Sequence, residues 1–385
     1  MKKYKTIIIG CGASGIMCAI NANGDNIAVI DMATKPGKKI LVTGNGRCNL
    51  TNVNLDSTHY NKNIDKYLKR FNVDDTLKFF NNLGLEYYHD EEGRVYPISN
   101  SAKSVVDVLV NKLEGKVDLF CEHVVEDVNR DNNLFKIKTN KEDFECEKLV
   151  ISSGGYSLNN IIKSLNIDYL SNCPSLVSLR CDNVRKELNG IKVSNVLVSA
   201  TNGKEFVKEM GEVLFKENGL SGIVIFNLST LFARNKEFKG NVIIDLLPRI
   251  TEKELINKLT KRMNLNVKMS RFFVGMFQNA LADEILRMSK IDTNINSDKL
   301  QVKQIEDLVK VIKNMTFNVV GCFDNNQVYS GGVDLNCLDD NLMSKIIPNL
   351  YFCGEVCDVD GVCGGYNLQW AWTSGKIVGE SLWLN

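Results

Sequence analysis

The sequence lacks an excess of charge of either sign, and it lacks long apolar runs. Lysine and arginine total 47 against 46 aspartate and glutamate residues, and no long run of one sign stands out. This balance predicts neither a nucleic acid nor a membrane surface as a partner. No uninterrupted apolar segment approaches the roughly 18 residues that span a bilayer. We therefore expect a cytoplasmic protein that acts on small molecules, and the sequence leaves its oligomeric state open.

Histidine is scarce in this chain. The three histidines, His59, His89 and His123, lie far apart in the sequence. Histidine-based metal sites have ligands at characteristic short spacings, so no metal centre is predicted. His123 lies within a strand-like pattern, which favours a structural role over that of a catalytic base.

A CxxC motif is also absent, although the chain contains 12 cysteines. They are scattered without regular spacing, which favours reduced thiols over a disulfide framework. A redox pair of Cys353 and Cys357, or of Cys357 and Cys363, stays open as an alternative. Cysteine is often simply a small buried residue, so we do not expect a catalytic disulfide.

The first thirty residues predict the fold class. A β-branched run over residues 6–9, a glycine turn, a helical pattern over 15–22 and a second strand over 27–30 form a βαβ unit. The two strands of such a unit are parallel and buried. Further strands are expected at 117–128, 134–139 and 144–152. The chain is therefore predicted to be an α/β protein.

The 385 residues exceed the size of most single hydrophobic cores, which predicts two domains. After Pro174 strands dominate, including one expected at Ile223–Asn227, and this pattern indicates a small β-barrel or sandwich. Residues 251–314 then turn helical. We expect an inserted domain over residues 182–315 that splits a first domain into segments 1–181 and 316–385.

Gly10, Gly12 and Gly15 form a GxGxxG turn between the first strand and the first helix. The first glycine permits the tight turn, the second lets the backbone approach a pyrophosphate, and the third lets the helix pack on the strand. The helix N-terminus adds positive potential. Asp31 ends the next strand, where a carboxylate accepts hydrogen bonds from a ribose. This arrangement predicts a bound dinucleotide.

The C-terminal segment favours FAD over NAD as that dinucleotide. Residues 350–355 form an apolar strand that ends in Gly354 and Glu355. FAD enzymes of the glutathione reductase type place an acidic residue at such a strand end to bind the ribityl chain. Gly364 and Gly365 then open a helix whose N–H groups are expected to face the pyrimidine edge of the flavin.

Four segments of the chain resemble the HI0933-like family of flavoproteins, which is also described as aminoacetone-oxidase-like or as the bile-acid Δ4/Δ6-reductase type. They are KKILVTGNGRCNLTN at 38–52, GRVYP at 93–97, SGGV at 330–333 and GEVCDVDGVCGGYNLQWAWTSG at 354–375. The resemblance runs from the first strand to the last helix. It implies a Rossmann-like FAD domain of the glutathione reductase type, split by an inserted β-barrel and helical domain, with the flavin in the cleft between them.

By position, the resemblance implies cofactor contacts along the whole chain. The adenosine diphosphate half would meet Gly10, Gly12, Ala13, Ser14, Gly15, Asp31 and the backbone of Val124. The flavin half would meet Lys39, Gly44, Gly46, Arg47, Cys48, Asn49, Ser153, Gly154, Gly354, Glu355, Gly365, Asn367 and Leu368. Two residues depart from the family pattern. Asp31 is shorter than the glutamate common among FAD binders, and Tyr329 stands where a small residue is expected.

The expected activity is hydride transfer through flavin N5 to or from a small organic substrate. Arg47, Arg94 and Tyr96 are the catalytic candidates, each with a structural role as an equal alternative. The favoured reaction is reduction of an activated C=C bond of a steroid or bile-acid enone, with NAD(P)H as a transient donor. An amine oxidase of the aminoacetone type that uses oxygen is the alternative, and a flavin-bearing sensor or binding module is another. No second GxGxxG follows a strand, so NAD(P)H has no motif of its own.

Overall fold

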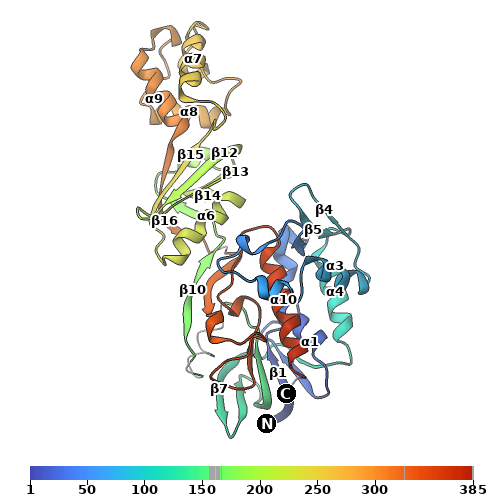
Figure 1. Cartoon of the computed structure of the whole chain (residues 1–385). Coiled ribbons are helices and arrows are strands. Elements are labelled where there is room, and N and C mark those ends of the chain that lie inside the picture. The colour runs from blue at the N-terminus through green and yellow to red at the C-terminus, as the bar shows by residue number, and fades with distance from the viewer. Residues whose placement is uncertain (156–160, 162–164, 166, 325, 384–385) are drawn as a thin grey trace. The chain divides into compact units, whose positions relative to one another are not determined.

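The computed structural model describes residues 1–155, 161, 165, 167–324 and 326–383 (Figure 1). The chain divides into unit 1, made of residues 1–173 and 328–385, and unit 2, made of residues 174–327. The predicted fold class, an α/β domain split by an inserted barrel, is confirmed. The insert is longer than the predicted 182–315 because the strands that close the barrel come from both of its ends.

Unit 1 is built on a seven-stranded sheet with a parallel centre. β1 (Lys2–Ile9) lies between β2 (Ile27–Ile30) and β9 (Phe144–Ile151), and β6 (Asp118–Phe120) and β18 (Leu350–Phe352) extend the parallel part. All four residues of β2 and all three of β18 are buried. Such continuous apolar strands are typical of parallel sheets that are covered on both faces.

The other edge of this sheet is an antiparallel hairpin. β7 (Val125–Asp131) pairs with β8 (Leu134–Thr139), which pairs with the first half of β9. The prediction of one strand over 117–128 was wrong, because the segment contributes separately to β6 and to β7. Glu122 has a φ of 58°, and this left-handed residue interrupts the extended chain between the two strands.

The helices of unit 1 include two that bring the ends of the chain together. α1 (Ala13–Asn21) packs on α10 (Tyr366–Ser381), and Gly375 and Gly379 let the two backbones approach closely. Other helices and strands described in this unit are α2 (Asp65–Leu68), α3 (Val73–Asn82), α4 (Ala102–Leu113), the small sheet of β3 (Thr51–Asn52), β5 (Arg94–Pro97) and β4 (Tyr87–His89), and the pair β10 (Tyr169–Ser175) and β17 (Val328–Val333).

Unit 2 begins with a closed antiparallel barrel. Its strands, in order around the barrel, are β11 (Leu179–Cys181), β14 (Gly219–Ser221), β13 (Phe206–Lys216), β12 (Lys192–Thr201), β15 (Gly240–Asp245) and β16 (Met315–Cys322). The strand predicted at Ile223–Asn227 was wrong, because this segment begins helix α6 (Ile223–Arg234). Gly222 has a φ of 110° and ends β14, and the following apolar residues pack on the barrel as a helix.

Three helices complete unit 2, as the helical pattern predicted. They are α7 (Glu252–Met263), α8 (Asn279–Met288) and α9 (Val302–Lys313). Their buried leucine, isoleucine and valine side chains belong to the same hydrophobic cluster as the interior of the barrel. None of the helices in the described part of the chain combines the length and the apolarity that are needed to cross a membrane.

Candidate functional site

The three glycines of the GxGxxG turn play three different steric roles. Gly10 has a φ of 104°, and a β-carbon there would lie 2.5 Å from the carbonyl oxygen of Ser152. A β-carbon on Gly15 would overlap the carbonyl oxygen of Gly10. At Gly12, by contrast, no heavy atom lies within 4 Å of the β-carbon position. This open space beside the backbone fits a pyrophosphate.

The N-terminus of α1 is open in the same place. Gly12 is the N-cap, no side chain caps the helix, and the first turn contains no acidic residue. The first N–H groups of a helix have no partner within the helix and carry partial positive charge. The Ser14 hydroxyl donates to the carbonyl oxygen of Cys353 at 3.2 Å and is therefore already engaged. The groups that Ala13 and Ser14 can offer to an anion are their backbone N–H groups.

Asp31 joins the glycine turn to the end of β2. Its carboxylate accepts hydrogen bonds from the backbone N–H of Cys11 at 2.5 Å and of Ala33 at 2.6 Å. Each carboxylate oxygen keeps further acceptor capacity, which a ribose hydroxyl can use. The Asp31 side chain, although shorter than a glutamate, therefore holds the glycine turn in place at the end of β2.

Val124 lies in the chain segment beside Asp31. The N–H of its neighbour His123 donates to the Asp31 carbonyl at 3.0 Å. The N–H of Val124 donates to Asn140 Oδ1 at 2.8 Å, and its carbonyl accepts from the Asn140 N–H at 3.1 Å. The structure thus places Val124 next to Asp31. Of the backbone polar groups of Val124, only the carbonyl keeps capacity for a further hydrogen bond, so the predicted contact with adenine would fall to that carbonyl.

Several residues of the loop around Arg47 have a left-handed backbone conformation. Gly44, Gly46 and Cys48 have φ values of 55°, 78° and 60°. A β-carbon on Gly44 would lie 2.9 Å from the backbone nitrogen of Asn49 and 3.5 Å from the Tyr96 ring. This loop therefore packs directly against β5.

Two of the catalytic candidates lie side by side. The Arg47 guanidinium lies over the Tyr96 ring, 4.3 Å from its centroid, and its Nε donates to the carbonyl of Gly44 at 3.3 Å. Burial raises the pKa of the Tyr96 phenol, and the nearby Arg94 and Arg47 charges oppose this shift. Arg94 itself is bound to Asp90 at 2.8 Å and to Glu92 at 2.9 Å.

Glu355 connects three separated segments of unit 1. Its carboxylate binds Lys39 Nζ at 2.6 Å and accepts from the N–H of Tyr329 at 2.8 Å and of Gly155 at 3.4 Å. A β-carbon on Gly155 would lie 2.6 Å from the Tyr329 side chain, so the absence of one makes room for the large ring. Gly154 lies against the same carboxylate.

An unpartnered acceptor lies at the N-terminus of α10. The Asn49 side chain is 9% exposed, and its Oδ1 has no hydrogen-bond partner. A β-carbon on Gly365, the N-cap of this helix, would lie 2.9 Å from that oxygen and 2.5 Å from the Thr51 carbonyl. No side chain caps α10. Free N–H groups and a buried acceptor together match a flavin pyrimidine ring, which has carbonyl acceptors and an N3–H donor.

Asn367 has a different position from the one that its predicted role suggests. Its side chain accepts from the N–H of Gly361 at 2.9 Å and donates to the Gly361 carbonyl at 2.8 Å. Because the amide holds the loop before α10, any contact of Asn367 with a cofactor falls to its backbone. Leu368 follows it in the first turn of the helix.

The sequence did not reveal how Gly354 is held. Its N–H donates to Ser374 Oγ at 2.8 Å, and its carbonyl accepts from Trp370 Nε1 at 3.0 Å. These two α10 residues are four positions apart and therefore share one helix face. That spacing was the only signal in the sequence.

The 12 cysteines all lie in the described residues, and none of them forms a disulfide. Cys353 and Cys357 are buried, and burial raises the pKa of the Cys357 thiol well above its usual value. A thiol with a raised pKa forms little thiolate and is a poor redox nucleophile.

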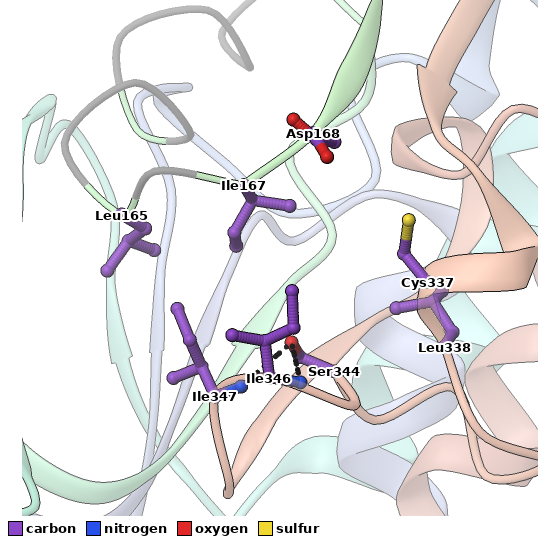
Figure 2. Close-up of a pocket in the computed structure, with 8 residues that line it drawn as sticks. All are labelled: Leu165, Ile167, Asp168, Cys337, Leu338, Ser344, Ile346 and Ile347. Atoms are coloured by element: carbon purple, nitrogen blue, oxygen red, sulfur yellow. Dashed lines mark hydrogen bonds between the residues drawn. The ribbon is translucent and has the colours of Figure 1, made fainter.

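A cavity of about 140 Å³ lies elsewhere in unit 1 (Figure 2). It is mostly apolar, and the Ser344 hydroxyl at its edge accepts hydrogen bonds from the N–H groups of Ile346 and Ile347. None of the predicted cofactor residues lines it. Its lining residues are Leu165, Ile167, Asp168, Cys337, Leu338, Ser344, Ile346 and Ile347.

The residues of unit 1 therefore fit an FAD molecule. Open space at Gly12, two uncapped helix N-termini and the unpartnered Asn49 oxygen match its pyrophosphate and its pyrimidine edge. Asp31 and Glu355 stand at the ends of β2 and β18, where the two sugar-like parts of the cofactor need acceptors.

Comparison with known proteins agrees with this assignment. The HI0933-like protein Rossmann domain model matches residues 4–381. The chain is 31% identical to a 3-dehydro-bile acid delta(4,6)-reductase of Clostridium scindens, over 97% of this chain and 98% of the relative. It is 30% identical to a ribosomal RNA dihydrouridine synthase of Escherichia coli, over 99% and 98%.

A solved structure of a 3-ketosteroid delta1-dehydrogenase from Sterolibacterium denitrificans has the same fold, with a TM-score of 0.51, 12% identity and 99% coverage of both chains. The chain belongs to the HI0933-like family and is an FAD-dependent oxidoreductase.

Proposed function

We propose that this enzyme reduces a C=C bond conjugated to a carbonyl group, with NAD(P)H as the electron donor. The observation that carries the proposal is similarity over nearly the full length to two enzymes whose names describe such a reaction. A 3-dehydro-bile acid with a delta-4 double bond is an enone. The double bond that uridine loses on becoming dihydrouridine is likewise conjugated to a ring carbonyl.

The proposed reaction adds a hydride to the carbon distant from the carbonyl and a proton to the carbon next to it, while NAD(P)H becomes NAD(P)⁺. Bound FAD supplies the hydride chemistry at flavin N5. The protein must then supply a proton donor and a positive charge for the carbonyl oxygen. We assign these tasks to Tyr96 and Arg47.

The geometry around Tyr96 supports this assignment. Burial raises the pKa of its phenol, so the hydroxyl keeps its proton at neutral pH. Arg47 forms no ion pair with any described residue, and its charge is free to face an electron-rich oxygen. Arg94 is committed to Asp90 and Glu92, which gives it a structural role in the β4–β5 hairpin.

Anaerobic stopped-flow spectroscopy tests the proposal. NADH or NADPH should bleach the flavin absorbance, and a 3-oxo-Δ4 bile acid should restore it without oxygen. Uridine-containing RNA serves as a second oxidant in the same instrument. Bleaching by aminoacetone alone, with recovery only in the presence of oxygen, would identify an amine oxidase and refute the proposal.

A further inference from the structure

Charge is divided unevenly between the two units. Unit 2 contains 23 lysine and arginine residues against 17 aspartate and glutamate residues, whereas unit 1 contains 24 against 29. The even balance of the whole chain, which predicted no nucleic-acid partner, is therefore a sum of a basic unit and an acidic one. A basic unit within a neutral chain indicates a local anionic partner.

A basic groove of about 460 Å³ lies at the helical part of unit 2. Its charged lining residues are all cations, Lys258, Lys261 and Arg262, and no acidic residue lines it. These three residues are three and four positions apart on α7, so they share one face of the helix. The apolar lining consists of Leu247, Ile250, Leu265 and Met276.

Hydrogen bonds fix both walls of the basic groove. Lys313 of α9 is largely buried, and its Nζ donates to the carbonyls of Leu247 at 3.0 Å and Ile250 at 2.9 Å. On the other side, the Arg262 guanidinium donates to the carbonyls of Phe272 and Val274. The groove is thus a built feature of the fold.

No ion pair in the described part of the chain involves the lysines at the groove, although Glu254 lies near enough to Lys258 for the two charges to attract. Lys258 and Lys261 are exposed and form no ion pair with any residue that the structure describes. Glu254, one turn before Lys258, is engaged with the N–H and hydroxyl of Thr251 in a capping box. Its charge is therefore partly used at the helix N-terminus. The charge of Lys261 and the part of the Lys258 charge that Glu254 does not offset are left for a partner.

We infer that the basic groove is a docking surface for RNA. The two exposed lysines, with the half-buried Arg262 on the same helix face, suit the repeated phosphates of a nucleic acid, whereas one carboxylate would need only one cation. The apolar lining suits an unstacked base, the form in which proteins usually recognise RNA. This inference rests on the proposed function, because uracil in RNA contains a C=C bond conjugated to a carbonyl.

Salt-dependent binding of a transcribed ribosomal RNA to the full-length holoenzyme tests the inference. In fluorescence anisotropy, the double variant Lys258→Gln/Lys261→Gln should lower the slope of log K against log salt by about 1.4–1.8, since each phosphate contact contributes about 0.7–0.9. The matched control is Lys78→Gln/Lys112→Gln, which removes two exposed lysines from α3 and α4 of unit 1. The control should keep the wild-type slope.

The outcomes separate the two proposals. Reduction of a bile-acid enone should be unchanged in the groove variant, because that assay needs no RNA. Equal slopes for wild type, groove variant and control would overturn RNA docking and leave the proposed reaction intact. Loss of bile-acid binding in the groove variant, with RNA binding unchanged, would show that the groove binds a small organic acid. Absence of any enone or uracil reduction would instead refute the proposed function.

Discussion

Substitution at Gly12 and Gly15 should separate cofactor binding from packing within a single turn. Gly12→Val points a side chain into open space, and the Gly12 φ of −85° accepts any residue. We expect the stability of the apoprotein to change by less than about 1 kcal/mol, because the helix-capping preference for glycine opposes the entropy gained by restricting the unfolded chain. Gly15→Ala would instead overlap the Gly10 carbonyl and cost about 1–3 kcal/mol.

The affinity for FAD should fall more in the Gly12→Val variant than in the Gly15→Ala variant, which is the reverse of the order expected for stability. A side chain at Gly12 excludes the pyrophosphate from the N–H groups of α1, and each lost hydrogen bond to a charged group costs about 1.5–3 kcal/mol. The Kd for FAD should therefore rise about 10- to 150-fold per lost bond. Urea denaturation of the apoproteins and flavin fluorescence titrations measure the two quantities. A folded Gly12→Val protein with wild-type affinity, or a Gly15→Ala apoprotein of wild-type stability, would refute this reasoning.

Three further predictions concern single side chains. Asn49→Leu removes a buried acceptor without a partner, so the apoprotein should gain about 1–3 kcal/mol in urea denaturation while FAD binding weakens; a less stable apoprotein would contradict this. Tyr96→Phe should slow enone reduction about 10²–10⁴-fold with flavin reduction by NAD(P)H unchanged, and the wild-type rate should hold as pH rises to about 10, because burial raises the pKa of the phenol above its ordinary value. Cys357→Ser should retain turnover, since burial raises the pKa of this thiol; loss of flavin reduction would indicate a redox pair.

The local patterns of the sequence predicted the fold class and the elements of the nucleotide turn. Residues 6–31 form the strand, turn, helix and strand that the glycine spacing indicated. The two wrong strand predictions arose where a single residue or a single packing surface determines the secondary structure. Glu122, with its positive φ, breaks an apparently continuous strand. The β-branched residues at the start of α6 have a high strand propensity, but they form a helix because its apolar residues pack on the barrel.

The sequence allowed us to predict which residues belong to the candidate site, but not which of them contact one another. The pairing of Arg47 with Tyr96 joins segments that are far apart in the sequence, and no local pattern encodes such a contact. The same is true of Tyr329, whose size was a departure from the family pattern until Gly155 proved to make room for it. The roles predicted for the cofactor residues stay predictions until they are tested by binding.

The contact between α1 and α10 has a consequence for the order in which a newly made chain can assemble. The first strands of the central sheet leave the ribosome before unit 2, whereas β18 and α10 follow it. Until β18 arrives, residues 149–151 of β9 form an uncovered sheet edge, which is a site for wrong pairing. The hydrogen bonds between Gly354 and the α10 residues Trp370 and Ser374 form only in this last step. We therefore expect FAD to bind only after the whole chain has been synthesised. By mass action, bound FAD then stabilises the packing of α1 on α10 against local unfolding.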